Sequence, residues 1–95
     1  MHVETMLRFP EAAAARGLSR STCYQQVARG LMTRPVRVGH RAVGWPASEI
    51  EAINAARIAG KSDDEIRELV RKLEAQRYSA AVQVQSKSIL ARPEP

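Results

Sequence analysis

Short apolar-patterned segments, separated by glycine and proline, make up the first sixty residues of the chain. Segment 10–16 starts with proline, has strong helix propensity and precedes Gly17, so it predicts a helix of about two turns. Ser19 is a good N-cap for a second helix over 20–29, whose apolar residues fall on one stripe. Two short helices joined by residues 17–19 are typical of a helix-turn-helix.

The pattern changes from helical to alternating after residue 35. β-branched and aromatic residues lie on both sides of an expected turn near Gly39 and His40, namely Val36, Val38, Val43 and Trp45. This pattern predicts a β-hairpin with very short arms. Such a hairpin is unstable alone and must pack against the helices. We expect Trp45 to be structural and to cover the junction between the hairpin and the next helix.

Two further helices are predicted after the hairpin. The third has Pro46 as its first helical residue and ends at Gly60. Its expected apolar stripe consists of Ile50, Ile53, Ala56 and Ile58. Residues 62–65 (SDDE) form a capping box, which predicts a fourth helix to about Tyr78. The near-heptad apolar positions of this helix are Ile66, Leu69, Val70 and Leu73. The fourth helix has two interpretations: it completes the core, or it mediates self-association or partner binding.

These elements predict a mainly α fold with a small β-hairpin wing, a winged helix-turn-helix, plus a C-terminal helix. Residues 1–8 are a short lead-in, and residues 1–60 form the winged helix-turn-helix domain. Residues 61–78 form the C-terminal amphipathic helix. Residues 79–95 are mostly polar and contain few apolar residues, so we predict a disordered tail. The alternation at 81–85 (AVQVQ) leaves a strand as an alternative there.

Positive charge is concentrated in one part of the chain. The 95 residues include 15 Lys+Arg and 10 Asp+Glu, for a net charge of +5 at pH 7. Segment 16–45 contains six arginines and no acidic residue, whereas basic and acidic residues nearly balance from residue 51 onward. Because dense arginine matches the geometry of phosphate groups, the segment favours nucleic acid as a partner, ahead of an anionic membrane. A solvated basic face is the alternative.

The residues offer little for catalysis. Cys23 is the only cysteine, which excludes an internal disulfide, and its place on the apolar stripe predicts a buried small hydrophobe. His40 has only His2 as a second histidine, so we expect no metal site and no cofactor. No nucleophile–base arrangement is present, so we expect no enzymatic activity. With no long apolar run and no signal-peptide pattern, we predict a cytoplasmic protein without membrane contact.

Four stretches of sequence resemble a known family. They are LSRSTCY at 18–24, RPVRVG at 34–39, RAVGW at 41–45 and SEI at 48–50. In this order and spacing they resemble the AlpA-type prophage regulators, which are close to the MerR-like winged-helix excisionases. The resemblance runs from about Leu7 to Ala59. Pro46 departs from the polar residue frequent in the family, and Cys23 from a larger aliphatic residue; neither departure affects the expected fold.

The resemblance implies a mode of action as well as a fold. The second helix is expected to enter the major groove of double-stranded DNA, and the wing to contact the flanking backbone or the minor groove. Members of this family regulate transcription of integrase genes or act as excisionases, also called recombination directionality factors. An excisionase binds repeated sites beside an attachment site, bends the DNA and biases a tyrosine recombinase (integrase) toward excision.

The second helix contains most of the candidate DNA contacts. Arg20 suits bidentate binding of guanine, and Gln25 or Gln26 suits adenine. Ser21 and Thr22 are short and suit phosphate or base contacts beside the free N–H groups of a helix start. Tyr24 either packs against the wing or touches a phosphate. The alternative for all the candidate residues of this helix is that they form a solvated helix face without a partner. The full set is Ser19, Arg20, Ser21, Thr22, Tyr24, Gln25, Gln26 and Arg29.

The hairpin supplies a second set of candidate contacts, Arg37, His40 and Arg41. An arginine at a wing tip suits the minor groove, where A·T tracts concentrate negative potential. A solvated turn is the alternative. Binding in both grooves would favour DNA bending.

Three functions follow from these observations, and we rank them. The first is an excisionase that binds repeated sites cooperatively, with neighbouring copies in head-to-tail contact, and assists an integrase. The second is a transcriptional regulator of integrase or prophage genes. The third is a protein-interaction adaptor that uses Leu69 and Leu73 of the fourth helix, with the basic face incidental.

Overall fold

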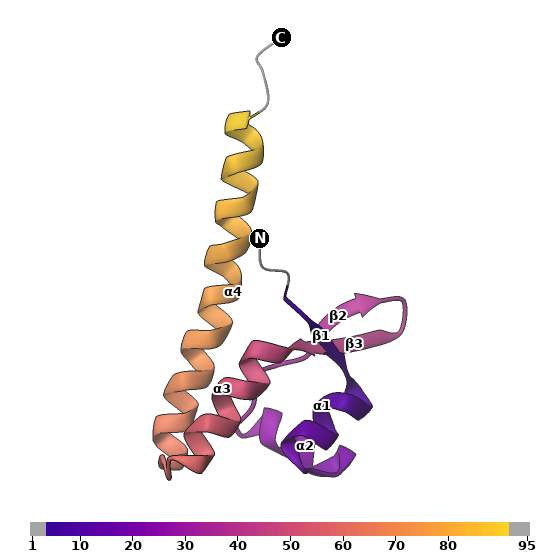
Figure 1. The fold of residues 1–95 in the computed structure, drawn as a ribbon, viewed down its shortest axis with the longest axis vertical. Helices are drawn as coiled ribbons and strands as arrows, with labels where there is room; N and C mark the ends of the chain where they lie inside the picture. The colour runs from indigo at the N-terminus through magenta and orange to yellow at the C-terminus, as the bar shows by residue number, and fades with distance from the viewer. Residues whose placement is uncertain (1–3, 92–95) are drawn as a thin grey trace.

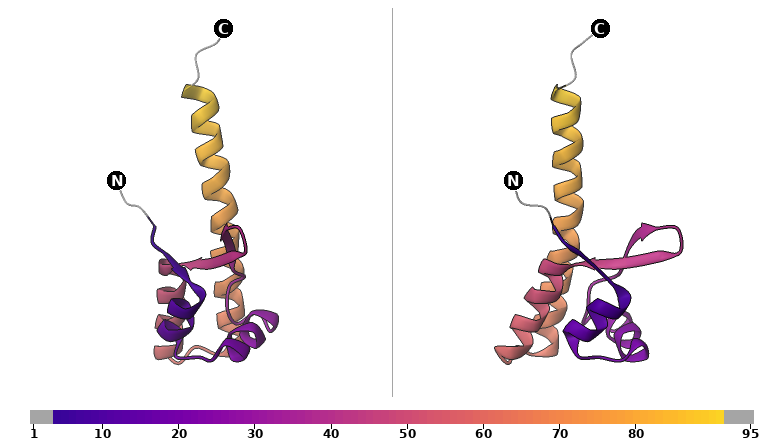
Figure 2. Two further views of the ribbon diagram at one scale, coloured as in Figure 1. Left: turned by 90° about the vertical axis from the view of Figure 1, so that its right-hand side faces the viewer. Right: turned by 45° about the vertical axis from the view of Figure 1, so that its right-hand side comes forward.

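The chain folds into four helices and a small antiparallel sheet, seen in a computed structural model that describes residues 4–91 and the side chains of residues 4–79. The elements are β1 (Met6–Arg8), α1 (Phe9–Arg16), α2 (Arg20–Ala28), β2 (Val36–Gly39), β3 (Ala42–Pro46), α3 (Ala47–Ile58) and α4 (Asp63–Ala91). The helices α1 and α2 and the β2–β3 hairpin lie on one side of the molecule, and α4 runs along the other (Figures 1 and 2). This arrangement confirms the predicted winged helix-turn-helix with an added C-terminal helix.

The two helices of the helix-turn-helix begin and end within one residue of the positions that the sequence predicts. Helix α1 ends at Gly17, which adopts the left-handed conformation (φ 71°) that glycine reaches without strain. Helix α2 is capped by Ser19, whose hydroxyl accepts a hydrogen bond from the backbone N–H of Thr22 at 3.3 Å. The connection therefore fixes the direction in which the first turn of α2 points.

The sheet contains one strand that the sequence analysis did not predict. Its order is β1-β3-β2 with both pairings antiparallel, so β3 is the central strand. The lead-in residues expected before the first helix supply β1, which pairs Leu7 with Trp45. Three residues are too few to show a period, and this strand exists because the edge of β3 offers it partners. The turn lies at His40 and Arg41, one residue beyond the expected position, and Arg41 adopts the left-handed conformation (φ 59°).

Gly44 is required where β1 crosses the hairpin. A Cβ atom at this position would lie 2.8 Å from the carbonyl oxygen of Leu7 and 3.2 Å from a methyl carbon of Val38. Real Cβ atoms do not approach backbone oxygens so closely, so any larger residue would push β1 away from β3. The glycine thus ties the start of α1 to the base of the wing.

The core is aliphatic and is centred on a single large aromatic side chain. Trp45 is buried, and its indole N–H donates to the carbonyl of Thr33 at 2.7 Å. It lies edge-on to Phe9, with ring centroids 5.4 Å apart. Cys23 is also buried, and burial raises the pKa of its thiol, partly offset by the nearby Arg16, so it stays a neutral hydrophobe near pH 7. The structural roles predicted for Trp45 and Cys23 are confirmed.

The start of α3 differs from the prediction by one residue. Pro46 is the N-cap and the last residue of β3, because it has an extended backbone (φ −58°, ψ 131°). The missing N–H of proline costs no stability at the N-cap, just as it would cost none at the predicted first helical position. Of the predicted stripe, Ile50 and Ile53 are buried, whereas Ile58 is 86% exposed.

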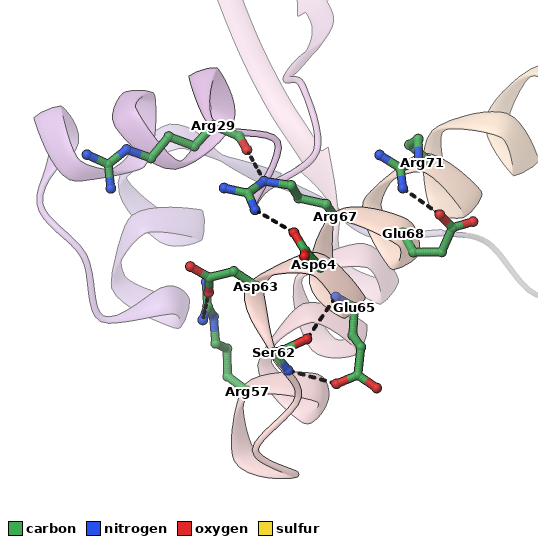
Figure 3. Close-up of polar contacts among 9 residues, drawn as sticks. All are labelled: Arg29, Arg57, Ser62, Asp63, Asp64, Glu65, Arg67, Glu68 and Arg71. Atoms are coloured by element: carbon green, nitrogen blue, oxygen red, sulfur yellow. Dashed lines mark hydrogen bonds and ion pairs between the residues drawn. The ribbon is translucent and has the colours of Figure 1, made fainter.

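The predicted capping box opens α4. The Ser62 N–H donates to the Glu65 carboxylate at 2.8 Å, and the Glu65 N–H donates to the Ser62 hydroxyl at 3.2 Å (Figure 3). The hydrogen bond from the Ser62 N–H, and then the Ser62 side chain, favour the charged form of the carboxylate and lower the pKa of Glu65. Ile66 and Val70 are part of the core, so the first half of α4 completes the domain.

Helix α4 continues past its predicted end at Tyr78. It remains helical to Ala91, so the prediction of disorder over 79–95 is wrong for residues 79–91, and the alternative strand at 81–85 is helical as well. The cause is that no glycine or proline interrupts the chain between Gly60 and Pro93, and alanine and glutamine favour a helix. The rest of the predicted tail, 92–95, lies outside the described residues. Among the described residues, no helix is long and apolar enough to cross a membrane.

Candidate nucleic-acid interface

A groove connects the first turn of α2 with the tip of the wing. It has a volume of about 480 Å³ and is lined by Arg8, Phe9, Pro10, Arg20, Tyr24, Arg41, Ala42 and Val43. Three of these side chains are guanidinium groups, and none is a carboxylate. Helix α2 and the hairpin, which supply several of these lining residues, lie on the same side of the molecule (Figure 2). Its chemistry suits a phosphate backbone or the edges of bases.

Arg20 is held in place by an aromatic side chain. Its guanidinium carbon lies 4.3 Å from the centroid of the Phe9 ring, a cation–π contact that is worth roughly 0.5–1 kcal/mol at an exposed site. Phe9 in turn packs on Tyr24, with centroids 5.1 Å apart. The contact restricts the rotamers of Arg20 before any partner binds, which lowers the entropy lost when it grips a ligand.

The arginines of this face are not committed to carboxylates. Arg20, Arg37 and Arg41 form no ion pair with any carboxylate of residues 4–79. The recorded pairs use the arginines at 34, 57, 67, 71 and 77. Because an unpaired guanidinium gives up no ion pair on binding, this face favours an anionic partner more than the α4 side does.

The predicted residues of α2 and its N-cap fall into four groups, three of which lie toward the start of the helix. Arg20 and Tyr24 line the groove, and Tyr24 is 48% exposed. Ser21 and Gln25 are exposed on the helix surface. Ser19 and Thr22 bond to each other: the Ser19 hydroxyl donates to the Thr22 hydroxyl at 2.9 Å. These two residues therefore fix the start of α2. To contact DNA as well, their hydroxyl groups would each have to form a further hydrogen bond.

Gln26 and Arg29 lie at the other end of α2, away from the groove. Both line a separate pocket with residues of α1 and α3. The side-chain amide oxygen of Gln26 accepts a hydrogen bond from Arg57 at 3.4 Å. The Arg29 backbone carbonyl accepts one from Arg67 at 2.8 Å (Figure 3). The structure therefore does not bring these two residues together with Arg20 and the wing.

The three predicted wing residues are all exposed. Arg41 lies at the turn and lines the groove, and His40 is beside it. Arg37 lies on β2 at an irregularity in the pairing with β3. The left-handed conformation of Arg41 and this irregularity in the strand pairing set the direction in which the tip of the wing points.

Arg8 is a groove residue that the sequence analysis missed. It ends β1, and its backbone N–H donates to the Glu11 carboxylate at 3.0 Å. Its position follows from β1 pairing with β3, where it lies opposite Gly44. In the structure Met6 and Arg8 are exposed and Leu7 is half-buried, but a segment of three residues is too short for the sequence to indicate a strand.

The fold and this face define a winged helix-turn-helix protein. Residues 5–58 match the family model described as prophage CP4-57 regulatory protein (AlpA), which is more than half of the chain. The chain therefore belongs to the AlpA family of prophage regulatory proteins, and the resemblance found in the sequence is confirmed. The match ends at the last residue of α3 and does not extend into α4.

One curated relative extends the comparison. The chain is 43% identical over 58 residues to the uncharacterized protein ORF88 of Enterobacteria phage P4. The match covers 61% of this chain and 66% of that protein, just under two thirds of its length. No solved structure matches the chain. Among the described residues, no cluster of three or more His, Cys, Asp or Glu could hold a metal ion.

Proposed function

We propose that the protein is a sequence-specific, double-stranded DNA-binding regulator of an integrated genetic element. The observation that carries this proposal is the groove between α2 and the wing, with three arginines and no carboxylate. Membership of a family of prophage regulatory proteins supports it. The function involves binding alone and needs no catalytic group.

In this proposal α2 reads the base edges in the major groove. The first turn of a recognition helix points at the bases, and here it presents Arg20 and Ser21, with Gln25 one turn further on. Arg41 and His40 at the wing tip contact the neighbouring minor groove or backbone. Arg8 and Arg41 line the groove together with Arg20 and suit phosphates, which fix the register of the protein on the duplex.

Replacement of Arg20 by alanine tests the base-reading role. We expect Arg20→Ala to weaken binding to the specific site by roughly 1–3 kcal/mol, because a bidentate guanine contact is lost. Binding to random DNA should fall much less. Competitive gel shifts with specific and random duplexes measure both. Arg71→Ala is a matched control, since Arg71 is an exposed arginine of α4, outside the groove.

The salt dependence of affinity provides an independent check on the whole proposal. Several arginine–phosphate contacts release counterions, so affinity should fall steeply as salt rises. An equal loss of specific and random binding in Arg20→Ala would contradict base reading by this residue. A flat salt response would contradict the nucleic-acid function itself.

For the finer role, we infer an excisionase that binds repeated sites beside an attachment site. Contacts from α2 and from the wing, in adjacent grooves, favour a bent duplex. Neighbouring copies would contact one another head to tail on the repeats, and an integrase would be the protein partner. Footprinting on the flanks of the element decides between this role and its rival. Cooperative complexes over repeats support an excisionase, whereas a single complex over an integrase promoter indicates a transcriptional regulator.

Removal of the wing-tip arginine tests the bending role. We expect Arg41→Ala to reduce both the affinity and the bend angle, because the wing loses its contact with the flanking groove. Circular-permutation gel shifts measure the angle. Arg37→Ala, on the arm of the same hairpin, shows how much of the effect belongs to the tip. An unchanged bend in Arg41→Ala would exclude the wing tip as the bending element.

A further inference from the structure

A second basic pocket lies at the opposite end of α2 from the groove. It has a volume of about 550 Å³, and the carboxyl-terminal parts of α1, α2 and α3 surround it. Three arginines line it, one from each helix or its C-cap: Arg16, Arg29 and Arg57. Apolar lining comes from Leu18, Leu31 and Ile58. The pocket therefore combines positive charge with an apolar surface.

The charges in this pocket are not balanced. Asp63 is the only carboxylate among the lining residues, and it pairs with Arg57 at 3.0 Å (Figure 3). Arg16 and Arg29 form no ion pair with a carboxylate of residues 4–79, which leaves a net charge of about +2 from the three guanidinium groups and Asp63. Burial, and then the positive charge of Arg57, lower the pKa of Arg16. The folded protein thus holds like charges together, and an anion would relieve their repulsion.

Two of the three guanidinium groups are already held in position. Arg16 donates to the Asn54 side-chain oxygen at 2.7 Å, and the Asn54 amide donates to the carbonyl of Ala15 at 3.0 Å. Arg57 is oriented by Asp63 and by Gln26 at 3.4 Å. The Nε atom of Arg16 is buried and has no acceptor among the described residues. A fixed cationic cluster of this kind loses little entropy when it binds an anion.

We propose that this pocket is a binding site for a phosphate group, distinct from the groove between α2 and the wing. The phosphate comes from the DNA backbone beside α2 or from a free phosphorylated small molecule whose apolar part contacts Leu18, Leu31 and Ile58. The first source rests on the proposed function; the second does not. Because Gln26 and Arg29 belong to α2 and its C-cap, a free ligand here would be linked to DNA binding through the recognition helix.

The first experiment uses the full chain without DNA. Pyrophosphate is titrated by calorimetry at constant ionic strength into the wild type, Arg57→Gln and Lys72→Gln. The control Lys72→Gln removes the same charge from an exposed residue of α4 that does not line the pocket. Binding to the wild type and to Lys72→Gln, with at least tenfold weaker binding to Arg57→Gln, supports the free-ligand source. Arg29→Gln serves as a second pocket variant if circular dichroism shows that Arg57→Gln does not fold.

The second experiment measures DNA affinity against salt for the same variants. A slope of log affinity against log salt that is about 0.9 smaller in Arg57→Gln than in Lys72→Gln assigns the phosphate to the DNA backbone. Equal slopes, together with pyrophosphate binding that is absent or the same in both variants, overturn the proposal. If the protein binds no DNA at all, the proposed function fails, and the pyrophosphate titration decides the present proposal alone.

Discussion

Replacing Trp45 by alanine is expected to lower the free energy of unfolding by about 3–5 kcal/mol, a large part of the stability of a domain of this size. The side chain is 1% exposed and packs edge-on against Phe9. Its removal leaves a cavity where β3, α1 and the loop before the wing meet. It also leaves the carbonyl of Thr33 without its 2.7 Å hydrogen bond. Urea denaturation followed by circular dichroism measures the loss.

Two companion variants separate the causes of this effect. Trp45→Phe removes the indole N–H but keeps most of the apolar volume, so it should cost less than Trp45→Ala. Tyr78→Ala truncates an aromatic residue that is 65% exposed and should change stability by no more than about 0.5 kcal/mol. A cost below about 1 kcal/mol for Trp45→Ala would contradict the role of this residue as the centre of the core.

The elements with clear local signals were predictable from the sequence. Gly17 and Ser19 fix the helix-turn-helix through backbone conformation and capping, which depend on neighbouring residues alone. The capping box at 62–65 is equally local. Strand β1 and the extension of α4 to Ala91 were not predicted. Strand β1 depends on pairing with a strand far along the chain, and the extension depends on the absence of a helix stop, which is a weak signal.

The candidate site was predictable only in part, for a related reason. Sequence proximity places Arg20, Gln26 and Arg29 on one helix, but the structure divides them between the groove and the second pocket. Arg8 and Arg41 join Arg20 because β1 and the hairpin bring distant segments beside α2. Packing also decides which arginines are free of ion pairs. Arg34 pairs with Glu74 of α4 and Arg77 pairs with Glu49 of α3, and no spacing rule in the sequence indicates either pair.

Replacing Arg77 by alanine is the second change with a large expected effect, about 3 kcal/mol of unfolding free energy. Arg77 binds the Glu49 carboxylate with two hydrogen bonds, at 2.7 Å and 2.6 Å. The Glu49 side chain is 6% exposed, so the substitution leaves a buried carboxylate without its partner. We place the effect at the lower end of the range for buried pairs because the Arg77 side chain is 26% exposed. Urea denaturation at pH 7 measures it.

The same helix provides a matched control. Arg71 pairs with Glu68 at 2.5 Å, but both side chains are more than half exposed, so Arg71→Ala should cost about 0–1 kcal/mol. Equal costs for Arg71→Ala and Arg77→Ala would contradict a special role for the buried pair. Glu49→Gln removes the buried charge and leaves an arginine that water can reach, so it should cost less than Arg77→Ala.

Arg77 also joins α4 to the segment that precedes the wing. Its guanidinium donates to the carbonyl of Arg34 at 2.8 Å, and the Arg34 N–H donates to the Glu74 carboxylate at 2.8 Å. Loss of Arg77 should therefore loosen the base of the hairpin as well as destabilise the fold. In hydrogen exchange, the amide of Arg34 should lose protection in Arg77→Ala and keep it in Arg71→Ala. Uniform loss across the domain would instead show that the pair contributes to global stability alone, with no separate part in positioning the wing.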